Sequence, residues 1–422
     1  MVAVVAGNGL GLFNSSLNVL GTSGMLGRPT LGRNGGAAYV NAATGNLVLQ
    51  FSDDDLSGRG ADLSLLRTYN SLGRMLGEPD PTGDGWQWDQ ERTVVFTPGA
   101  HNEGRNAGGT VTRTTGDGHV TVYTWNSATQ TYVSHDGDGA NDFFTFVPAT
   151  AGQAAEWIWT DGSTQQRDLY SDSSASSPGQ LLSQTDVSGN TIKFGYDGAL
   201  LTDITDLGSG QKIKLVYSAG QLQEVDTFEL LTDPTTGQVT DPPTIGSSPI
   251  KQVRYTYDNG RLGSVKTLLN PDAADSPVFV TTYTYVDDRS HLIKSISQND
   301  GTATGTSYRV NFTYTTDGTN RVATVTDASG TQTFIYKANS TDITLSDAGG
   351  GPQTWTYIYD PVTGQLGQID APAPAPGAER LSTQFQYDAA GNLTEVIDAR
   401  GNAIIYQYDA NGNQILERDS LG

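Results

Sequence analysis

From about residue 190 onward, aromatic or apolar residues recur in pairs that are two positions apart, and the second member of each pair is Tyr. A spacing of two places both side chains on the same face of a β-strand, where cross-strand aromatic contacts stabilise a sheet. No helical periodicity interrupts the pattern, which therefore predicts an all-β array. The pairs are Phe194/Tyr196, Leu215/Tyr217, Tyr255/Tyr257, Tyr283/Tyr285, Phe312/Tyr314, Phe334/Tyr336, Tyr357/Tyr359, Phe385/Tyr387 and Tyr406/Tyr408.

A turn follows most of these Tyr residues, as in Tyr196-Asp197-Gly198 and Tyr257-Asp258-Asn259-Gly260. Asp can accept a hydrogen bond from its own backbone two residues on, and Gly supplies the positive φ that reverses the chain, so each turn predicts a β-hairpin. A second strand follows, and an Asp-x-x-Gly turn such as 398–401 often closes the unit. Leu393 and Val396 lie an odd number of positions apart in such a strand, so either both faces are covered or a β-bulge intervenes.

The hairpins are expected to pair edge to edge into one continuous, curved sheet. The clearest units are 21 residues long, and a hairpin of that size cannot bury its aromatic face alone. The insertion 232–249 and the Pro-rich segment 371–376 are expected outside the sheet, since Pro cannot donate to a strand ladder. The motif is interrupted at residue 422, so we expect a longer chain that continues the last edge.

Charge and composition exclude several classes of protein. The 422 residues hold 24 Lys plus Arg against 46 Asp plus Glu, a net charge of -22, which would repel a phosphate backbone and argues against nucleic-acid partners. There is no Cys for a disulfide or thiolate site, and no apolar run reaches the roughly 18 residues of a membrane-spanning helix. Gly7, Gly9 and Gly11 follow an apolar start but lack the G-x-G-x-x-G fingerprint of a dinucleotide-binding loop.

One loop carries a candidate metal site. Asp136, Asp138 and Asp142 alternate with Gly and other residues, and carboxylate oxygens at such spacing suit Ca²⁺. The twelfth-position Glu of an EF-hand is missing, and a plain hairpin turn between 131–133 and 143–146 is the favoured interpretation. No other cofactor is expected.

Other candidate chemistry is weaker. His101, His119 and His135 match no zinc spacing, so we interpret them as loop histidines. No nucleophile or phosphate-binding motif occurs, and many Asp residues are already explained as turn formers, so we expect no catalysis. The first half holds the pairs Trp86/Trp88 and Trp157/Trp159, which would stack on sugars if exposed and belong to the core if buried, the commoner outcome.

Two segments closely resemble the YD repeat of RHS proteins, a repeat that also occurs in shell-forming components of insecticidal toxin complexes and in teneurins. They are residues 387–394, Tyr-Asp-Ala-Ala-Gly-Asn-Leu-Thr, and residues 406–413, Tyr-Gln-Tyr-Asp-Ala-Asn-Gly-Asn. The resemblance implies that the repeats wind as a continuous β-strip into a hollow shell, which in many members encloses a C-terminal toxin.

Residues 39–49, 53–56, 67–71 and 85–88 are similar to the domain that precedes the repeats in many RHS proteins. We therefore expect a flexible leader over 1–34, an RHS N-terminal β domain over 35–165 and a YD-repeat array over 166–422. The sequence lacks a recognisable RHS core motif, the aspartate pair of self-cleavage and a variable toxin domain. By the resemblance, the downstream part of the same polypeptide, or a partner chain, would complete the shell and supply the cargo.

The favoured hypothesis is a non-catalytic structural segment of an RHS-type shell that contains or delivers a downstream, toxin-like domain. The alternative is a secreted or surface adhesion protein that binds glycans, and a third is a β-rich hydrolase with an unlocated carboxylate pair. The expected location is secreted or on a bacterial cell surface, by a route that the sequence does not identify.

Overall fold

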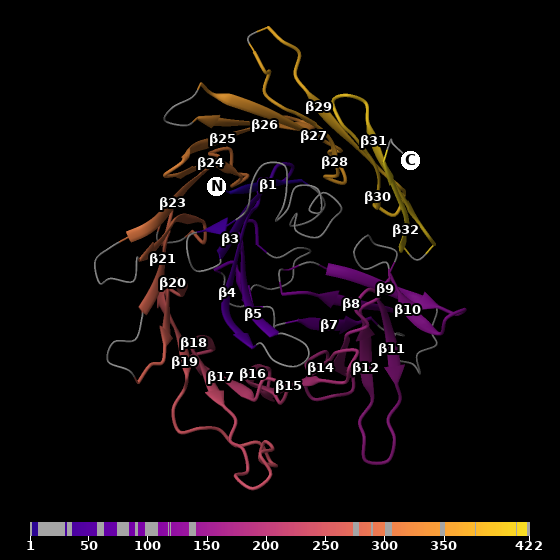
Figure 1. The fold of residues 1–422 in the computed structure, drawn as a ribbon, viewed down its shortest axis with the longest axis vertical. Coiled ribbons are helices and arrows are strands. Elements are labelled where there is room, and N and C mark those ends of the chain that lie inside the picture. Colours follow the sequence, from indigo (N-terminus) through magenta and orange to yellow (C-terminus); the bar gives the residue numbers. More distant parts are fainter. Residues whose placement is uncertain are drawn as a thin grey trace.

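The described residues form two β-sheets, of which the longer curves around the shorter (Figure 1). The computed structural model describes residues 2–6, 30–31, 36–56, 63–73, 84–88, 92–97, 109–116, 118, 120–134, 141–272, 278–287, 290–299, 306–346, 351–375, 377–410 and 412–419. These residues contain strands and turns and no helix, hence none that could cross a membrane. The all-β prediction is confirmed.

The inner sheet is formed by the N-terminal strands, drawn in indigo in Figure 1. Its strand order is β1-β3-β4-β5-β6, with β2 also paired to β3, and only the β1–β3 pairing is parallel. Three consecutive residues, Leu47, Val48 and Leu49, are fully buried, so both faces of this sheet are covered. The strands are β1 (Ala3–Val5), β2 (Thr30–Leu31), β3 (Gly36–Asn41), β4 (Leu47–Leu56), β5 (Leu63–Asn70) and β6 (Trp86–Trp88).

The outer sheet runs from β7 to β32, and each strand pairs antiparallel with the next. Its strands are β7 (Thr93–Phe96), β8 (Thr110–Thr114), β9 (Val120–Asn126), β10 (Thr131–Val133), β11 (Phe143–Val147), β12 (Glu156–Thr160), β13 (Arg167–Ser171), β14 (Leu181–Thr185), β15 (Thr191–Asp197), β16 (Leu200–Asp206), β17 (Gln211–Ser218), β18 (Gln221–Glu229), β19 (Lys251–Asp258), β20 (Arg261–Leu269), β21 (Val278–Tyr285), β22 (Ile293–Asn299), β23 (Thr306–Tyr314), β24 (Val322–Asp327), β25 (Gly330–Tyr336), β26 (Ser340–Ser346), β27 (Gln353–Tyr359), β28 (Leu366–Asp370), β29 (Ser382–Tyr387), β30 (Leu393–Ile397), β31 (Ala403–Tyr408) and β32 (Gln414–Asp419).

The two ends of the outer sheet differ. Among the described residues no pairing joins β32 to β7, and most of β32 is exposed. β7 instead contacts the segment before β14, where Thr93 forms an isolated bridge with Gln180 and the Val94 N–H donates to the Gly179 carbonyl at 3.2 Å. A Cβ at position 179 would lie 2.0 Å from the Val94 carbonyl oxygen, so this contact requires glycine.

A β-bulge explains the odd spacing of Leu393 and Val396. Phe385 pairs with Val396 and Tyr387 pairs with Leu393, so β30 carries one extra residue and both apolar side chains reach the same face. The bulge, one of the two alternatives left open by the sequence, is thus the one the structure adopts. The same register shift precedes Tyr196, Tyr217, Tyr257, Tyr285, Tyr314, Tyr359 and Tyr408.

The sheet pairing places some segments differently from the expected domains. Val2–Ala6 lie within the 1–34 segment expected to be a flexible leader, yet these five residues are at most 3% exposed and belong to the inner sheet. Pairing is continuous from β12 to β14, across the expected boundary at 165/166, and the change from one sheet to the other falls between Trp88 and Thr93. The three-domain division stays a prediction.

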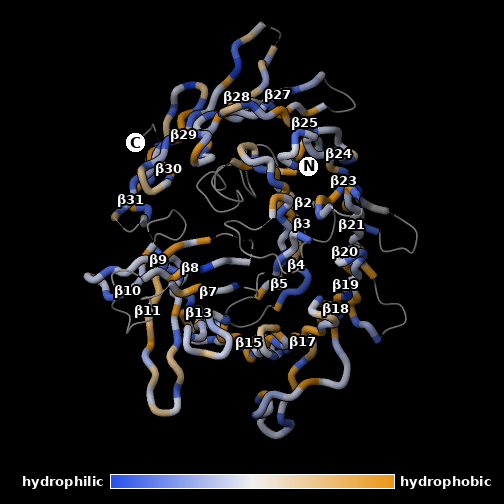
Figure 2. Tube along the Cα trace, turned by 180° about the vertical axis from the view of Figure 1, so that it is seen from behind, coloured by the Kyte–Doolittle hydropathy of each residue, from blue (hydrophilic) through white to orange (hydrophobic). Residues whose placement is uncertain are grey.

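Hydrophobic and hydrophilic residues alternate along many strands of the outer sheet (Figure 2). In β17, for example, Ile213 and Leu215 are buried while Lys214 and Val216 are exposed. The buried series belongs to one core cluster together with residues of the inner sheet. We call the side of the outer sheet that curves around the inner sheet the concave face (Figure 1). No strand forms in 232–249 or in the described residues of 371–376, as expected.

Candidate functional site: the concave face of the repeat sheet

At six positions the Tyr that ends a repeat pair ties its hairpin to the preceding one. The Tyr257 hydroxyl donates to the Leu222 carbonyl at 2.7 Å, which links β19 to β18, and the bond recurs along the sheet. Equivalent bonds of 2.7–2.9 Å join Tyr196 to Leu181, Tyr285 to Leu262, Tyr314 to Ile293, Tyr336 to Val322 and Tyr408 to Leu393. The repeated Tyr is therefore a hydrogen-bonded staple between hairpins as well as a core ring.

The Asp of each Asp-x-x-Gly-Asn turn caps its own turn. Asp398 accepts bonds from the Arg400 and Asn402 N–H groups at 2.8 Å and from the Asn402 side chain. Gly401 has a φ of 83°, the conformation that L side chains rarely adopt. The Asn402 side chain and backbone bonds stabilise the carboxylate and lower the pKa of Asp398. These bonds confirm the turn chemistry predicted from the sequence.

A buried charge cluster joins the inner sheet to the concave face. Arg67 on β5 donates from Nε and Nη2 to the two carboxylate oxygens of Asp53 on β4, at 2.8 and 3.1 Å. From the outer sheet, the Tyr255 hydroxyl donates to Asp53 Oδ2 at 2.8 Å, and Arg67 Nη1 donates to the Tyr283 hydroxyl at 3.2 Å. Every charged group in this cluster is thus paired, as burial requires.

The pKa values of Arg67, Tyr255 and Tyr283 are all raised in this cluster. Burial alone would lower the pKa of Arg67, but Asp53, Tyr283 and Tyr255 together outweigh it and the pKa is raised. Burial raises the pKa of Tyr283 to about 12, and burial together with Asp53 raises that of Tyr255 well above its usual range. All three side chains therefore hold their protons at physiological pH.

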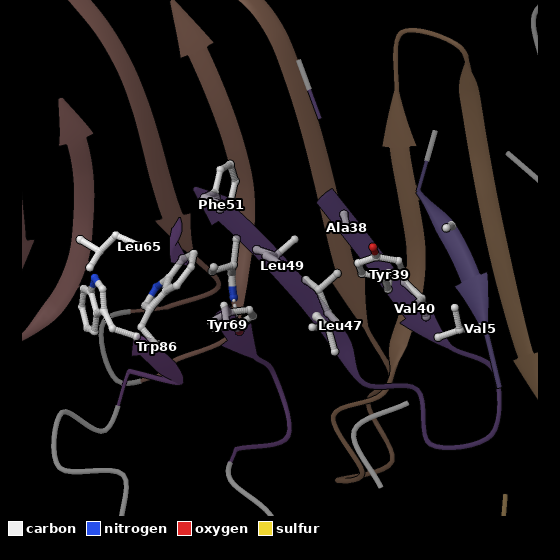
Figure 3. Close-up of a cluster of buried hydrophobic side chains, with 14 of the residues drawn as sticks. Val5, Ala38, Tyr39, Val40, Leu47, Leu49, Phe51, Leu65, Tyr69 and Trp86 are labelled. Carbon is white, nitrogen blue, oxygen red and sulfur yellow. Dashed lines mark hydrogen bonds between the residues drawn. The ribbon is translucent and has the colours of Figure 1, made fainter. Parts of the chain in front are cut away.

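Aromatic side chains of the inner sheet pack on the same two tyrosines. The Trp86 ring lies 5.1 Å from Tyr283 and the Trp88 ring 5.9 Å from Tyr255, both edge to face, while the Arg67 guanidinium lies 4.2 Å from the Trp86 ring centroid. Figure 3 shows Trp86 among the buried side chains of the inner sheet, with strands of the outer sheet behind them.

Further polar contacts extend the interface on both sides of the cluster. Asp54 Oδ1 pairs with Lys251 Nζ at 2.7 Å, and its other oxygen accepts a bond from the Thr227 hydroxyl. Tyr69 donates to the His291 carbonyl at 2.9 Å, and the His291 ring contacts the Ser71 carbonyl at 2.8 Å. These pairs join residues about 170 to 220 positions apart.

A second buried cluster lies within the outer sheet. Asp168 Oδ2 pairs with Arg113 Nη2 at 3.1 Å and with Arg92 Nη1 at 3.3 Å. The Arg113 guanidinium lies 3.6 Å from the Trp159 ring centroid, and the Trp159 N–H donates to the Tyr123 hydroxyl. This cluster fixes β8, β9, β12 and β13 relative to one another.

The concave face also borders a cavity of about 640 Å³ beside the edge of the inner sheet. Trp88 of β6 forms one wall, and Arg92, Thr93 and Gln180 contribute from the start of β7 and the segment before β14. Three successive hairpins provide the remainder, through Tyr196, Ala199, Leu200, Leu201, Leu215, Tyr217, Ala219, Gly220, Gln221, Leu222, Tyr257 and Gly260.

The structure locates only part of the predicted calcium loop. Asp136 and Asp138 lie outside the described residues, and Asp142 Oδ1 accepts a bond from the Gly162 N–H at 2.9 Å. The described part of the chain holds no group of three or more His, Asp or Glu side chains suited to a metal. Calcium binding by this loop stays a prediction, and His101, His119 and His135 lie outside the described residues.

The paired tryptophans are core residues. Trp86, Trp88, Trp157 and Trp159 are at most 6% exposed, and the Trp157 N–H donates to Asp172 Oδ1 at 3.0 Å. Of the two interpretations that the sequence allowed, burial is the correct one, so these rings offer no platform for a sugar.

Sequence reasoning did not predict the Asp53–Arg67–Tyr255–Tyr283 cluster. Asp53 and Arg67 stand in segments noted for their family resemblance, and both tyrosines belong to the repeat pairs. The signal available was an acidic run followed by Arg in an otherwise apolar strand, since a buried charge must be paired. The partners in the outer sheet lie about 200 residues away, and no local pattern identifies them.

One carboxylate pair stands out on the opposite face of the sheet. Gln252 Nε2 donates to Glu224 Oε1 at 2.6 Å and to Asp226 Oδ1 at 2.7 Å, while Arg254 Nε pairs with Glu224 Oε2 at 3.2 Å. Burial and the neighbouring Asp226 carboxylate raise the pKa of Glu224.

The geometry defines a class: a protein built from stapled β-hairpin repeats whose concave face holds an inner sheet. Two family models match segments of this chain. Residues 381–422 match the RHS repeat, and residues 38–123 match a domain of unknown function named DUF6531. The resemblance to the RHS repeat that the sequence implied is thus confirmed over residues 381–422.

Curated relatives match over a short segment. The tRNA nuclease WapA of Bacillus subtilis strain 168 and the tRNA(Glu)-specific nuclease WapA of Bacillus subtilis subsp. natto are each 40% identical over 63 residues. That segment is 15% of this chain and 3% of the length of either relative.

Solved structures of toxin complexes are similar over most of this chain. TcdB2-TccC3 without its hypervariable C-terminal region matches at 13% identity and a TM-score of 0.30, and the Photorhabdus luminescens Tc holotoxin pore at 11% and 0.29. The matches cover 92% and 91% of this chain, which spans 25% of each of those chains.

Proposed function

We propose that this chain is a non-catalytic structural segment of an RHS-type shell that contains or delivers a downstream, toxin-like domain. One observation carries the proposal: a continuous sheet of stapled hairpins curves around an apolar concave face and holds the inner sheet of its own chain there through the Asp53–Arg67–Tyr255–Tyr283 cluster. A concave face of this kind can enclose a polypeptide. It is formed by repeated hairpins and not by a set of catalytic residues.

Protease protection tests containment in the native protein purified from its own host. Measurement of the intact mass and C-terminal sequencing would first define the downstream polypeptide that the shell is proposed to contain. We expect that polypeptide to resist a nonspecific protease in the native protein and to be digested rapidly when expressed alone. Equal digestion rates in the two samples would refute containment.

The nuclease activity named for WapA does not enter the proposal, because the matched segment is 3% of that protein. Secretion or display on a bacterial cell surface is part of the proposal and follows from a role in delivery. Fractionation of the host with an antibody against this chain tests it, and recovery in the cytoplasmic fraction alone would contradict it.

The adhesion alternative loses one of its supports, since the four paired tryptophans are buried. The calcium loop at Asp136, Asp138 and Asp142 stays as a separate proposal with its own test. Titration calorimetry of the wild type and of the D136N/D138N double variant should show Ca²⁺ binding to the former and none to the latter. An identical, flat response in both would remove the site.

A further inference from the structure

The 640 Å³ cavity lies where the inner sheet stops covering the repeats. Over β19 and β21 the concave tyrosines Tyr255 and Tyr283 are covered by Trp88 and Trp86. In β17 the corresponding member of the repeat pair is Leu215, which lines the cavity instead. Trp88 forms the wall shared by the two regions, so the cavity continues an interface that already binds aromatic side chains of a polypeptide.

The cavity walls offer apolar contact more than hydrogen bonding. Leu201, Leu215 and Leu222 are 5–7% exposed and project from three neighbouring strands. The hydroxyls of Tyr196 and Tyr257 already donate to main-chain carbonyls, so their rings provide mainly apolar surface. A volume of about 640 Å³ lies within the roughly 300–1,000 Å³ of protein ligand sites, and it is large enough for more than one big side chain.

The covered part of the interface indicates the form of the occupant. Trp86 and Trp88 are two residues apart on one strand, and their rings reach the concave tyrosines of β21 and β19. Neighbouring repeats pair at a regular strand spacing. The repeats that the inner sheet does not cover therefore present their concave side chains at the same regular spacing. An extended segment with large apolar side chains at alternate positions fits this arrangement.

We propose that the cavity beside Trp88 binds a polypeptide segment through large apolar side chains, aromatic ones foremost, spaced two residues apart. The assignment rests on the proposed function in one respect: the segment is taken to belong to the polypeptide that the shell holds. The cavity is then an anchoring point on the wall, where a contained chain is bound by its apolar residues.

A labelled peptide tests the site directly on the full chain. The probe is an uncharged nine-residue peptide with a central Trp-Gln-Trp, and its control carries Ser-Gln-Ser. We expect fluorescence anisotropy to show saturable binding of the first peptide and at least tenfold weaker binding of the second. Equal binding of both peptides would overturn the proposal.

Two matched variants locate the binding. Leu200 lines the cavity and is 40% exposed, so L200W adds a large ring beside the cavity without replacing a buried residue. Val216 is 46% exposed and neighbours Leu215 with its side chain on the opposite face, so V216W adds the same ring outside the cavity. L200W should weaken peptide binding about tenfold and V216W should leave it unchanged, with circular dichroism and Tm confirming that both variants fold.

Three results would contradict the site: equal weakening by both variants, no weakening by L200W, or binding of the neutral dye N-phenyl-1-naphthylamine without binding of the Trp peptide. The last would assign the cavity to small apolar molecules. Failure here is distinguishable from failure of the proposed function, because protease protection without peptide binding would retain the shell and remove the anchor.

Discussion

Within the repeat, the Tyr hydroxyl has a role that is separate from the packing of its ring. Its bond to a carbonyl of the preceding hairpin recurs at six positions with donor–acceptor distances of 2.7–2.9 Å. A hydrogen bond of this kind contributes about 1 kcal/mol net, and the carbonyl left behind when it is removed adds to the loss. Because the bond recurs along the array, these contributions add up to a large stabilisation of the whole sheet.

The staple can be tested by removing one hydroxyl. We expect Y257F to lower the free energy of unfolding by about 1–2 kcal/mol in urea denaturation, because the Leu222 carbonyl loses its donor. Y308F is the matched control, since the buried Tyr308 hydroxyl has no hydrogen-bond partner in the described part of the chain. The control should be neutral or slightly stabilising, and equal losses in both variants would assign the effect to the rings.

The Glu224–Asp226 pair predicts a pH dependence at the scale of single residues. The pKa of Glu224 is raised in the folded protein, so its contribution to stability is fully present below the unfolded pKa and is lost as pH rises through the folded pKa. E224Q should therefore raise Tm at pH 7, and the gain should disappear near pH 4. Thermal melts from pH 4 to 8 measure this, and a gain that grows toward low pH would contradict the assignment.

Among the elements, one buried ion pair within the inner sheet supports its contact with the outer sheet. R67M would leave the Asp53 carboxylate buried without its cation, which costs about 3–5 kcal/mol. We expect a large fall in the free energy of unfolding, measured by urea denaturation. The D53N/R67M double variant should recover part of the loss because no charge is then left unpaired. If the double variant is less stable than R67M, pairing is not the source of the effect.

At the scale of the whole molecule, the inner sheet completes the core of the repeats. Deleting residues 2–88 would expose Tyr255, Tyr283 and their neighbours on the concave face, so we expect strong binding of an apolar dye and association of the chains. Replacing 233–248 with a short Gly-Ser linker is the control, because this insertion lies outside the strands of the sheet. Light scattering and dye fluorescence should be high for the deletion of 2–88 and unchanged for the replacement of 233–248. A deletion variant that stays monomeric and binds no dye would show that other residues cover the concave face.

Repetition determined how much of this molecule could be predicted from its sequence. The pairs two residues apart and the Asp-x-x-Gly turns are local signals, because strand alternation and positive φ act within a few residues. They predicted the hairpins, the continuous sheet and the caps that Asp398 and its equivalents form. The odd spacing of Leu393 and Val396 already limited the choice to a bulge or two covered faces, and the pairing of Tyr387 with Leu393 decided it.

The sequence by itself determined the class of fold, since every hairpin carries its own pattern and turn. Only the tertiary structure decided what the concave face holds. Asp53 and Tyr255 are 202 residues apart, and Ala3–Val5 become a buried strand because β3 and the outer sheet lie beside them. The physical reason is that an apolar strand or a buried charge is stabilised by whichever surface covers it, and that surface is formed by the curvature of the assembled sheet.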